Sequence, residues 1–99
     1  MKTQKDFERV SKMYRDEMPK VKRLETAGIQ KDFYGKAITL TYGDGTVILQ
    51  SYSTKVAVKF PDGEVFKLWD GWSQTTGRHI KSFCGMNKAE FNALPLVTL

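Results

Sequence analysis

The side chains that could take part in chemistry are concentrated in one stretch, FKLWDGWSQTTGRHIKSFC, which runs from Phe66 to Cys84. This stretch holds both tryptophans, the only histidine and the only cysteine of the chain. His79 is the one side chain whose ordinary pKa lies near neutrality, so it could act as a general base. The spacing of the sequence indicates no Ser, Cys or Asp partner for it, and a structural or exposed histidine is the alternative interpretation.

The remaining reactive residue types do not assemble into a recognisable active site. Cys84 follows the apolar Phe83, which favours a buried small hydrophobe over a nucleophile. One cysteine and one histidine cannot form a tetrahedral structural zinc site. The acidic residues at predicted turns have no spacing that selects a hydrolytic pair; they are Asp44, Asp62, Glu64 and Asp70. We therefore expect no catalytic residues, no metal and no cofactor.

The distribution of charge predicts a binding surface. The chain has 16 basic and 11 acidic residues, a net charge of +5. Residues 1–36 contain ten of the basic and six of the acidic residues, so they carry most of the excess. Such an excess favours contact with nucleic acid or an acidic protein, and a solvated face is the alternative. The N-terminal residues predicted to bind are Lys5, Arg9, Lys12, Arg15, Lys20, Lys22 and Arg23.

Five further residues are predicted to contact a partner. Lys55 and Lys59 are expected on the same face of one strand, with Tyr52 close by, an arrangement that could stack unpaired bases. Trp72 is either an exposed binding anchor or a plug between sheet and helix. Arg78 and His79 lie in a polar rim that could face phosphate.

Helical spacing dominates the N-terminal third of the chain. Thr3 and Asp6 form a candidate capping box, and Phe7, Val10, Tyr14 and Met18 repeat at helical intervals. Pro19 should end this helix and start a second, shorter one from Lys20 to Ala27, closed by Gly28.

From Lys36 the apolar period changes to two, which predicts strands. Turn signals lie at Gly43–Thr46 and Pro61–Gly63, and Tyr52–Thr54 is interpreted as a break or bulge. These signals separate three or four antiparallel strands within residues 36–69, one face of which we expect to meet water. The predicted strands are 37–42, 47–50, 55–60 and 64–69.

Two short helices are predicted after the sheet. Ser73 is placed as the N-cap of a helix that Gly85 ends, and Gly77 inside it should allow a neighbour to approach closely. Asn87 and Glu90 could cap a further helical turn, with an apolar tail docked on the core. The sequence thus predicts one α+β domain with a helical arm (1–28), an antiparallel sheet (36–69) and C-terminal helices (73–94).

The expected compartment is the cytosol. The longest apolar runs are too short for a membrane helix, and MKTQKDFERV lacks the apolar core of a signal peptide. A single cysteine allows no internal disulfide.

Part of the chain resembles a family of small uncharacterised proteins encoded by phages and other mobile elements. The family pattern reads SYxTxVA followed by KLWxGxSxTTxRHIxxF. The matching residues are Ser51, Tyr52, Thr54, Val56, Ala57, Lys67, Leu68, Trp69, Gly71, Ser73, Thr75, Thr76, Arg78, His79, Ile80 and Phe83. The resemblance implies no catalytic residues, and it suggests a small accessory protein that binds host machinery.

Three functional hypotheses follow. The first is a non-enzymatic, anti-CRISPR-like inhibitor that occludes a host nucleoprotein or defence complex through its basic surface. The second is a protein that binds single-stranded DNA or RNA directly. The third is an enzyme, such as a nuclease, in which His79 works with a turn carboxylate.

Overall fold

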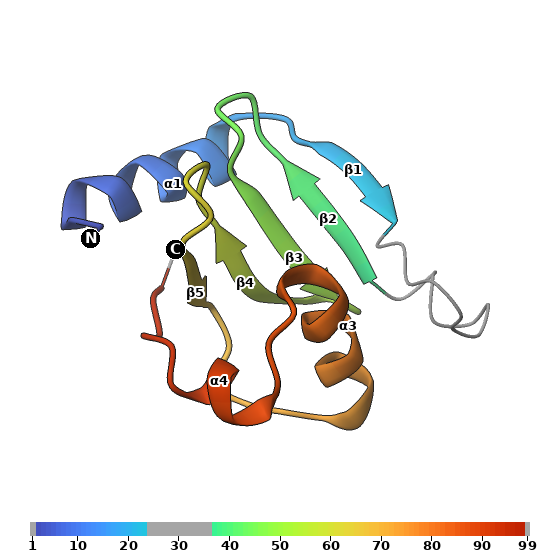
Figure 1. Cartoon of the computed structure of the whole chain (residues 1–99). Helices are drawn as coiled ribbons and strands as arrows, with labels where there is room; N and C mark the ends of the chain where they lie inside the picture. The colour runs from blue at the N-terminus through green and yellow to red at the C-terminus, as the bar shows by residue number, and fades with distance from the viewer. Residues whose placement is uncertain (1, 24–36, 99) are drawn as a thin grey trace.

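The computed structural model describes residues 2–23 and 37–98 and has the predicted α+β fold. Helix α1 (Gln4–Asp16) precedes a five-stranded antiparallel sheet, and helices α3 (Gln74–Cys84) and α4 (Lys88–Asn92) follow it. The strands lie side by side in chain order, as Figure 1 shows. They are β1 (Lys20–Arg23), β2 (Ala37–Thr41), β3 (Val47–Ser51), β4 (Thr54–Lys59) and β5 (Val65–Lys67).

Helix α1 begins where the sequence predicts. The Asp6 carboxylate accepts a hydrogen bond from the Thr3 amide at 2.7 Å, which completes one half of the capping box. The apolar stripe of the helix buries Val10 and Met13 against the sheet. The N-terminal helix is therefore part of the packed domain.

The prediction of a second helix is wrong for residues 20–23, the part of it that the structure describes. Lys20–Arg23 is a strand that pairs antiparallel with β2, so that Val21 lies opposite Leu40. Helix α1 ends at Asp16, and Pro19 disfavours helical geometry at Met18. The chain then pairs with β2, whose backbone offers more hydrogen-bond partners than a single helical turn. The rest of that prediction, residues 24–28, lies outside the described residues.

From β2 to β5 both faces of the sheet carry buried side chains, which corrects the expected water-facing side, whereas β1 is exposed at Lys20, Val21 and Lys22. Residues that alternate along the strands divide between two clusters. The cluster on the α1 face contains Val10, Met13, Leu40, Tyr42, Ile48, Val58, Phe60 and Phe66. The cluster on the α3 and α4 face contains Ala37, Leu49, Val56, Ala57, Val65, Ile80, Phe83 and Phe91. Figure 1 shows α3 in front of the lower ends of β3 and β4, and α4 below β5.

A β-bulge in β4 explains one wrong prediction. Leu49 pairs with Ala57 but Gln50 pairs with Lys55, which leaves Val56 as an extra residue. The bulge reverses the alternation, so Lys55 and Lys59 lie on opposite faces instead of the same one. The ammonium group of Lys55 lies 5.3 Å from the centre of the Tyr14 ring on the α1 face, whereas that of Lys59 donates to the Phe83 carbonyl of α3 at 3.0 Å.

The segment interpreted as a break is a tight hairpin turn. Tyr52 and Ser53 alone connect β3 to β4, and Tyr52 has a φ of 56°. A positive φ at the first position is the requirement of a type II′ turn, where glycine is the usual residue. The backbone at Tyr52 is therefore strained.

The C-terminal tail docks on the sheet, as predicted. The Lys67 amide donates to the Pro95 carbonyl at 3.1 Å, and the Val97 amide donates to the Lys67 carbonyl at 2.9 Å. These bonds form a parallel bridge between Lys67 and Leu96 beside β5.

Candidate functional site

A buried polar cluster joins β3 to α3. The hydroxyl oxygen of Ser51 lies 2.7 Å from Nδ1 of His79 and 3.2 Å from the hydroxyl oxygen of Thr76. Thr76 and His79 are three residues apart on α3, so both project from one face of the helix toward the end of β3. Ser51 is 2%, Thr76 6% and His79 0% exposed.

A hydroxyl beside an imidazole is the pairing that nucleophilic catalysis uses, but this pair is enclosed. The Tyr52 ring lies 6.3 Å from the imidazole, at the turn that follows Ser51. His79 is therefore not on the surface where it was predicted to meet a partner. Sequence spacing could not find Ser51, because the two residues come together only when α3 packs on the sheet.

A second site lies on the surface between α3 and α4, and we call it the basic groove. It has a volume of about 260 Å³. Its lining consists of Trp72, Gln74, Gly77, Arg78, Lys81, Met86, Asn87 and Lys88.

The floor of the basic groove is built by a glycine in α3. A β-carbon at Gly77 would lie 2.7 Å from Cε2 of Trp72, so only glycine lets the indole pack on the helix. The Trp72 ring also contacts the Phe91 ring, with centroids 5.9 Å apart. Trp72 is half-buried: it packs against the core cluster and also lines the groove, so it combines features of both predicted alternatives. The close approach predicted at Gly77 is confirmed.

The rim of the basic groove carries three exposed cations, Arg78, Lys81 and Lys88. Within the described part of the chain, none of them has an ion-pair partner. Arg78 was a predicted binding residue. Lys88 was not, because it belongs to a separate helix that only the fold places beside Arg78.

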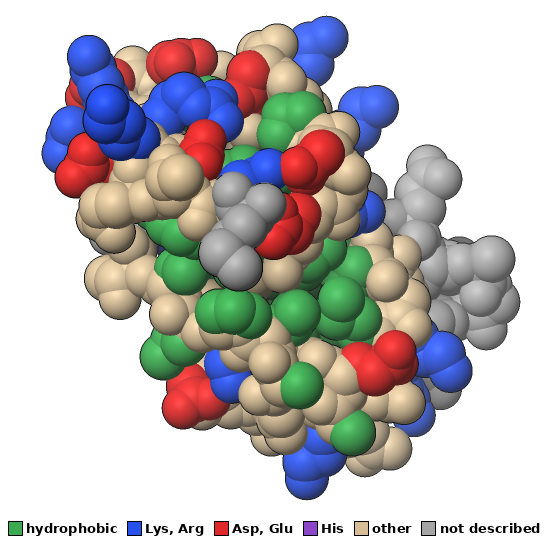
Figure 2. Space-filling view, turned by 60° about the vertical axis from the view of Figure 1, so that its left-hand side comes forward, with side chains coloured by type: hydrophobic (Ala, Val, Ile, Leu, Met, Phe, Trp, Pro, Cys, Tyr) green, Lys and Arg blue, Asp and Glu red, His purple; other side chains and the backbone are tan. Residues whose placement is uncertain are grey.

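The basic residues of α1 have acidic residues close by. Arg9 pairs with Asp44, and the Arg15 guanidinium lies 3.5 Å from the Asp16 carboxylate. Lys5 and Lys12 are exposed. Figure 2 shows cationic and anionic side chains interleaved over the upper part of the face it presents.

The other predicted lysines are scattered. Lys20 and Lys22 are exposed on β1, and Arg23 belongs to the same strand by its backbone. Lys55 and Lys59 are half-buried and rest on aromatic rings, Lys59 at 4.6 Å from the centre of the Phe83 ring. The fold therefore does not gather the predicted residues into one patch.

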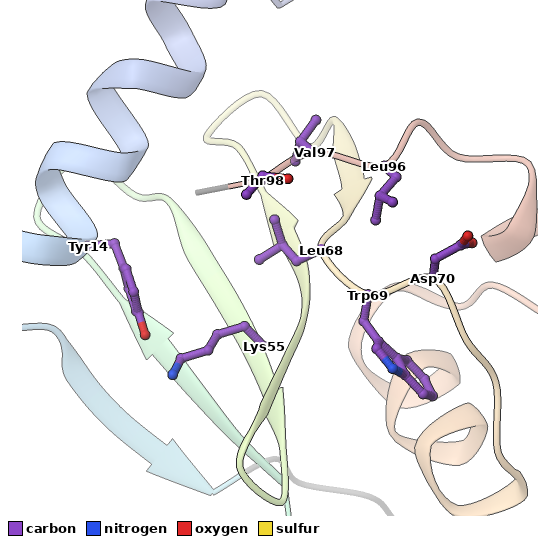
Figure 3. Close-up of a pocket in the computed structure, with 8 residues that line it drawn as sticks. All are labelled: Tyr14, Lys55, Leu68, Trp69, Asp70, Leu96, Val97 and Thr98. Carbon is purple, nitrogen blue, oxygen red and sulfur yellow. The ribbon is translucent and has the colours of Figure 1, made fainter.

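A third site, the tail pocket, lies between α1, β4 and the C-terminal tail (Figure 3). Its volume is about 350 Å³. It is lined by Tyr14, Lys55, Leu68, Trp69, Asp70, Leu96, Val97 and Thr98. Hydrophobic side chains also form a band across the middle of the face in Figure 2.

The single cysteine is not activated. Burial raises the pKa of the Cys84 thiol, and its sulfur lies 3.3 Å from the Ile80 carbonyl oxygen, to which it donates. A raised pKa lowers the fraction of reactive thiolate at neutral pH.

Across residues 2–23 and 37–98, no three side chains of His, Cys, Asp or Glu are grouped so as to hold a metal ion. In the same ranges, no helix is long and apolar enough to cross a membrane.

The fold and sites define a small α+β domain with a basic groove and an enclosed polar cluster. Residues 21–93 match the model of a family of unknown function, DUF8033, and the chain belongs to that family. No curated protein and no solved structure matches the chain.

Proposed function

We propose that this protein is a non-enzymatic binding protein that docks on the acidic surface of a nucleoprotein complex and blocks it. The observation that carries the proposal is the basic groove, in which Arg78, Lys81 and Lys88 surround the apolar floor formed by Trp72 and Met86. Exposed cations steer an acidic partner, and a half-buried aromatic side chain supplies contact area at the centre of an interface.

The resemblance to small phage and mobile-element proteins supports a host nucleoprotein or defence complex as the partner. The enclosure of Ser51 and His79 supports binding over catalysis, because a substrate would have to reach atoms that are almost completely buried. On this proposal the protein acts in the cytosol of a host cell.

The test compares two charge reversals of equal size. Arg78→Glu with Lys81→Glu reverses the groove rim, and Lys5→Glu with Lys12→Glu reverses two exposed cations of α1. Tagged wild-type protein should recover a nucleoprotein complex from host lysate, and the groove variant should lose it while the α1 variant retains it. Equal recovery by the two variants, or no specific partner for the wild type, would refute the proposal.

Direct binding of single-stranded nucleic acid is the second candidate. It is favoured by an indole and three cations in the same groove, the combination that stacks bases and neutralises phosphates. It predicts that a fluorescent oligonucleotide binds without any protein partner, with an affinity that falls steeply between 50 and 200 mM salt, roughly the interval over which phosphate contacts are lost. Nuclease treatment of the lysate should then abolish recovery, whereas the first candidate predicts that recovery survives it.

A further inference from the structure

The tail pocket is an apolar cavity with one charged end. Its walls are formed by Leu68 and Trp69 after β5 and by Leu96 and Val97 of the tail. Leu96 is 51% exposed although it is a large aliphatic residue. A volume of about 350 Å³ is within the range of small-molecule sites, which are mostly apolar with a few convergent polar groups.

The bulge at Val56 places the Lys55 ammonium group at this pocket. Because it turns Lys55 toward the α1 face, the Lys55 ammonium lies over the Tyr14 ring, at 5.3 Å from its centre. Figure 3 shows the Lys55 amine and the Tyr14 hydroxyl pointing toward one another at one end of the pocket. Two hydrogen-bond donors of different elements therefore converge there.

The acidic residue at the other end is already neutralised. Asp70 accepts a hydrogen bond from the Lys67 ammonium at 2.9 Å, and Lys67 also donates to the Asn92 carbonyl at 3.1 Å. In the described residues no carboxylate forms an ion pair with Lys55. Among the described residues, Lys55 is thus a cation without an ion-pair partner at the Tyr14 end of the pocket.

We infer that the tail pocket binds a small amphipathic carboxylate. Its apolar body would lie along Leu68, Val97 and Leu96, and its carboxylate would accept hydrogen bonds from Lys55 and from the Tyr14 hydroxyl. Charge-assisted hydrogen bonds in a largely apolar site discriminate strongly for the anion over a neutral ligand of the same length. This site is separate from the basic groove and does not depend on the function proposed for it.

The experiment titrates isotope-labelled protein with sodium decanoate and, as a neutral ligand of matched length, with 1-decanol. Decanoate should give saturable NMR shifts at residues 68–70 and 96–98. Lys55→Met should weaken decanoate binding by about tenfold, because one charge-assisted hydrogen bond is lost, and should leave decanol binding unchanged. Lys22→Met, which removes an exposed lysine of β1, is the control and should bind decanoate like the wild type.

A second pair of variants keeps Lys55 in place. Leu96→Glu adds a carboxylate to the exposed wall and should repel decanoate. Leu96→Gln introduces a neutral side chain of nearly the same shape as glutamate and should affect decanoate and decanol binding equally. The inference is overturned if decanoate does not saturate, if its shifts lie outside the pocket, or if Lys55→Met and Lys22→Met bind it alike.

Discussion

Ser51 and His79 are 28 positions apart in the chain, yet the serine hydroxyl lies 2.7 Å from Nδ1 of the imidazole. Thr76 contacts the same hydroxyl, so one oxygen of β3 links two side chains of α3. Because these groups are withdrawn from water, the hydrogen bonds fix the position of α3 on the sheet. The basic groove lies on this helix, and its geometry depends on that position.

Replacing the shared hydroxyl should destabilise the fold. Ser51→Ala removes a partner of both Thr76 and His79 in a buried site, and we expect a loss of about 1–3 kcal/mol in the free energy of unfolding. Ser82→Ala, at an exposed position of α3, is the control and should change the free energy of unfolding by less than about 0.5 kcal/mol. Urea denaturation of the two variants measures the difference, and equal stabilities would contradict the linking role.

Gly77→Ala should be destabilising, although alanine ordinarily stabilises a helix relative to glycine. The added methyl group would overlap the Trp72 indole and push it from the groove floor, at a cost of about 1–3 kcal/mol. Tryptophan fluorescence in a Trp69→Phe background should shift to longer wavelength. Gly43→Ala is the matched control, since nothing lies within 4 Å of a β-carbon there, and a stable Gly77→Ala protein with unchanged emission would refute the packing.

Strain at Tyr52 can be isolated by comparing two small residues. Tyr52→Gly and Tyr52→Ala both remove the ring, but only glycine adopts the φ of 56° without steric cost. The free energy of unfolding of the glycine variant should therefore be about 1 kcal/mol larger than that of the alanine variant. Thermal and urea denaturation would reveal this order, and an alanine variant of equal or greater stability would show that the turn is unstrained.

Acid should loosen α1 before the sheet. The hydrogen bond from Lys2 lowers the pKa of Asp62, and the backbone hydrogen bond from Thr3 lowers that of Asp6. At Asp44 burial raises the pKa, but hydrogen bonds from Thr46 and Arg9 outweigh it and leave the pKa lowered. All three carboxylates hold α1 or connect it to a turn of the sheet.

Lowered pKa values mean that the folded state favours the ionised carboxylates. Their contribution to stability is present above the usual pKa of 3.8 and is lost as the pH falls through the lower folded values. Amide exchange measured from pH 5 downward should show α1 opening first. Asp62→Asn should reduce this pH dependence, whereas Glu8→Gln, at an exposed position of the same helix, should retain it; identical profiles would disprove the linkage.

Local signals in the sequence predicted the elements that rest on local chemistry. The capping residues Thr3, Ser73 and Asn87 mark the starts of α1, α3 and α4, and Gly85 ends α3 with a φ of 76°. These features can be predicted from the sequence because a cap involves residues only three or four positions apart.

The errors come from pairing between distant segments. Strand β1 exists because β2 lies beside it, and the bulge at Val56 is set by the register with β3. That one extra residue separates Lys55 from Lys59 and moves Lys55 into the tail pocket. The Ser51–His79 contact has the same origin, so the sequence predicted the scaffold better than the sites on it.

The bridge between Lys67 and Leu96 also bears on how copies of this protein behave in concentrated solution. An unpaired outer strand is a template for sheet growth from molecule to molecule, and the tail occupies that position beside β5. At the opposite border, the four-residue β1 carries the exposed ammonium groups of Lys20 and Lys22, which repel a second copy. We therefore expect the two borders to hinder sheet growth between molecules by different means, one by obstruction and one by like charge.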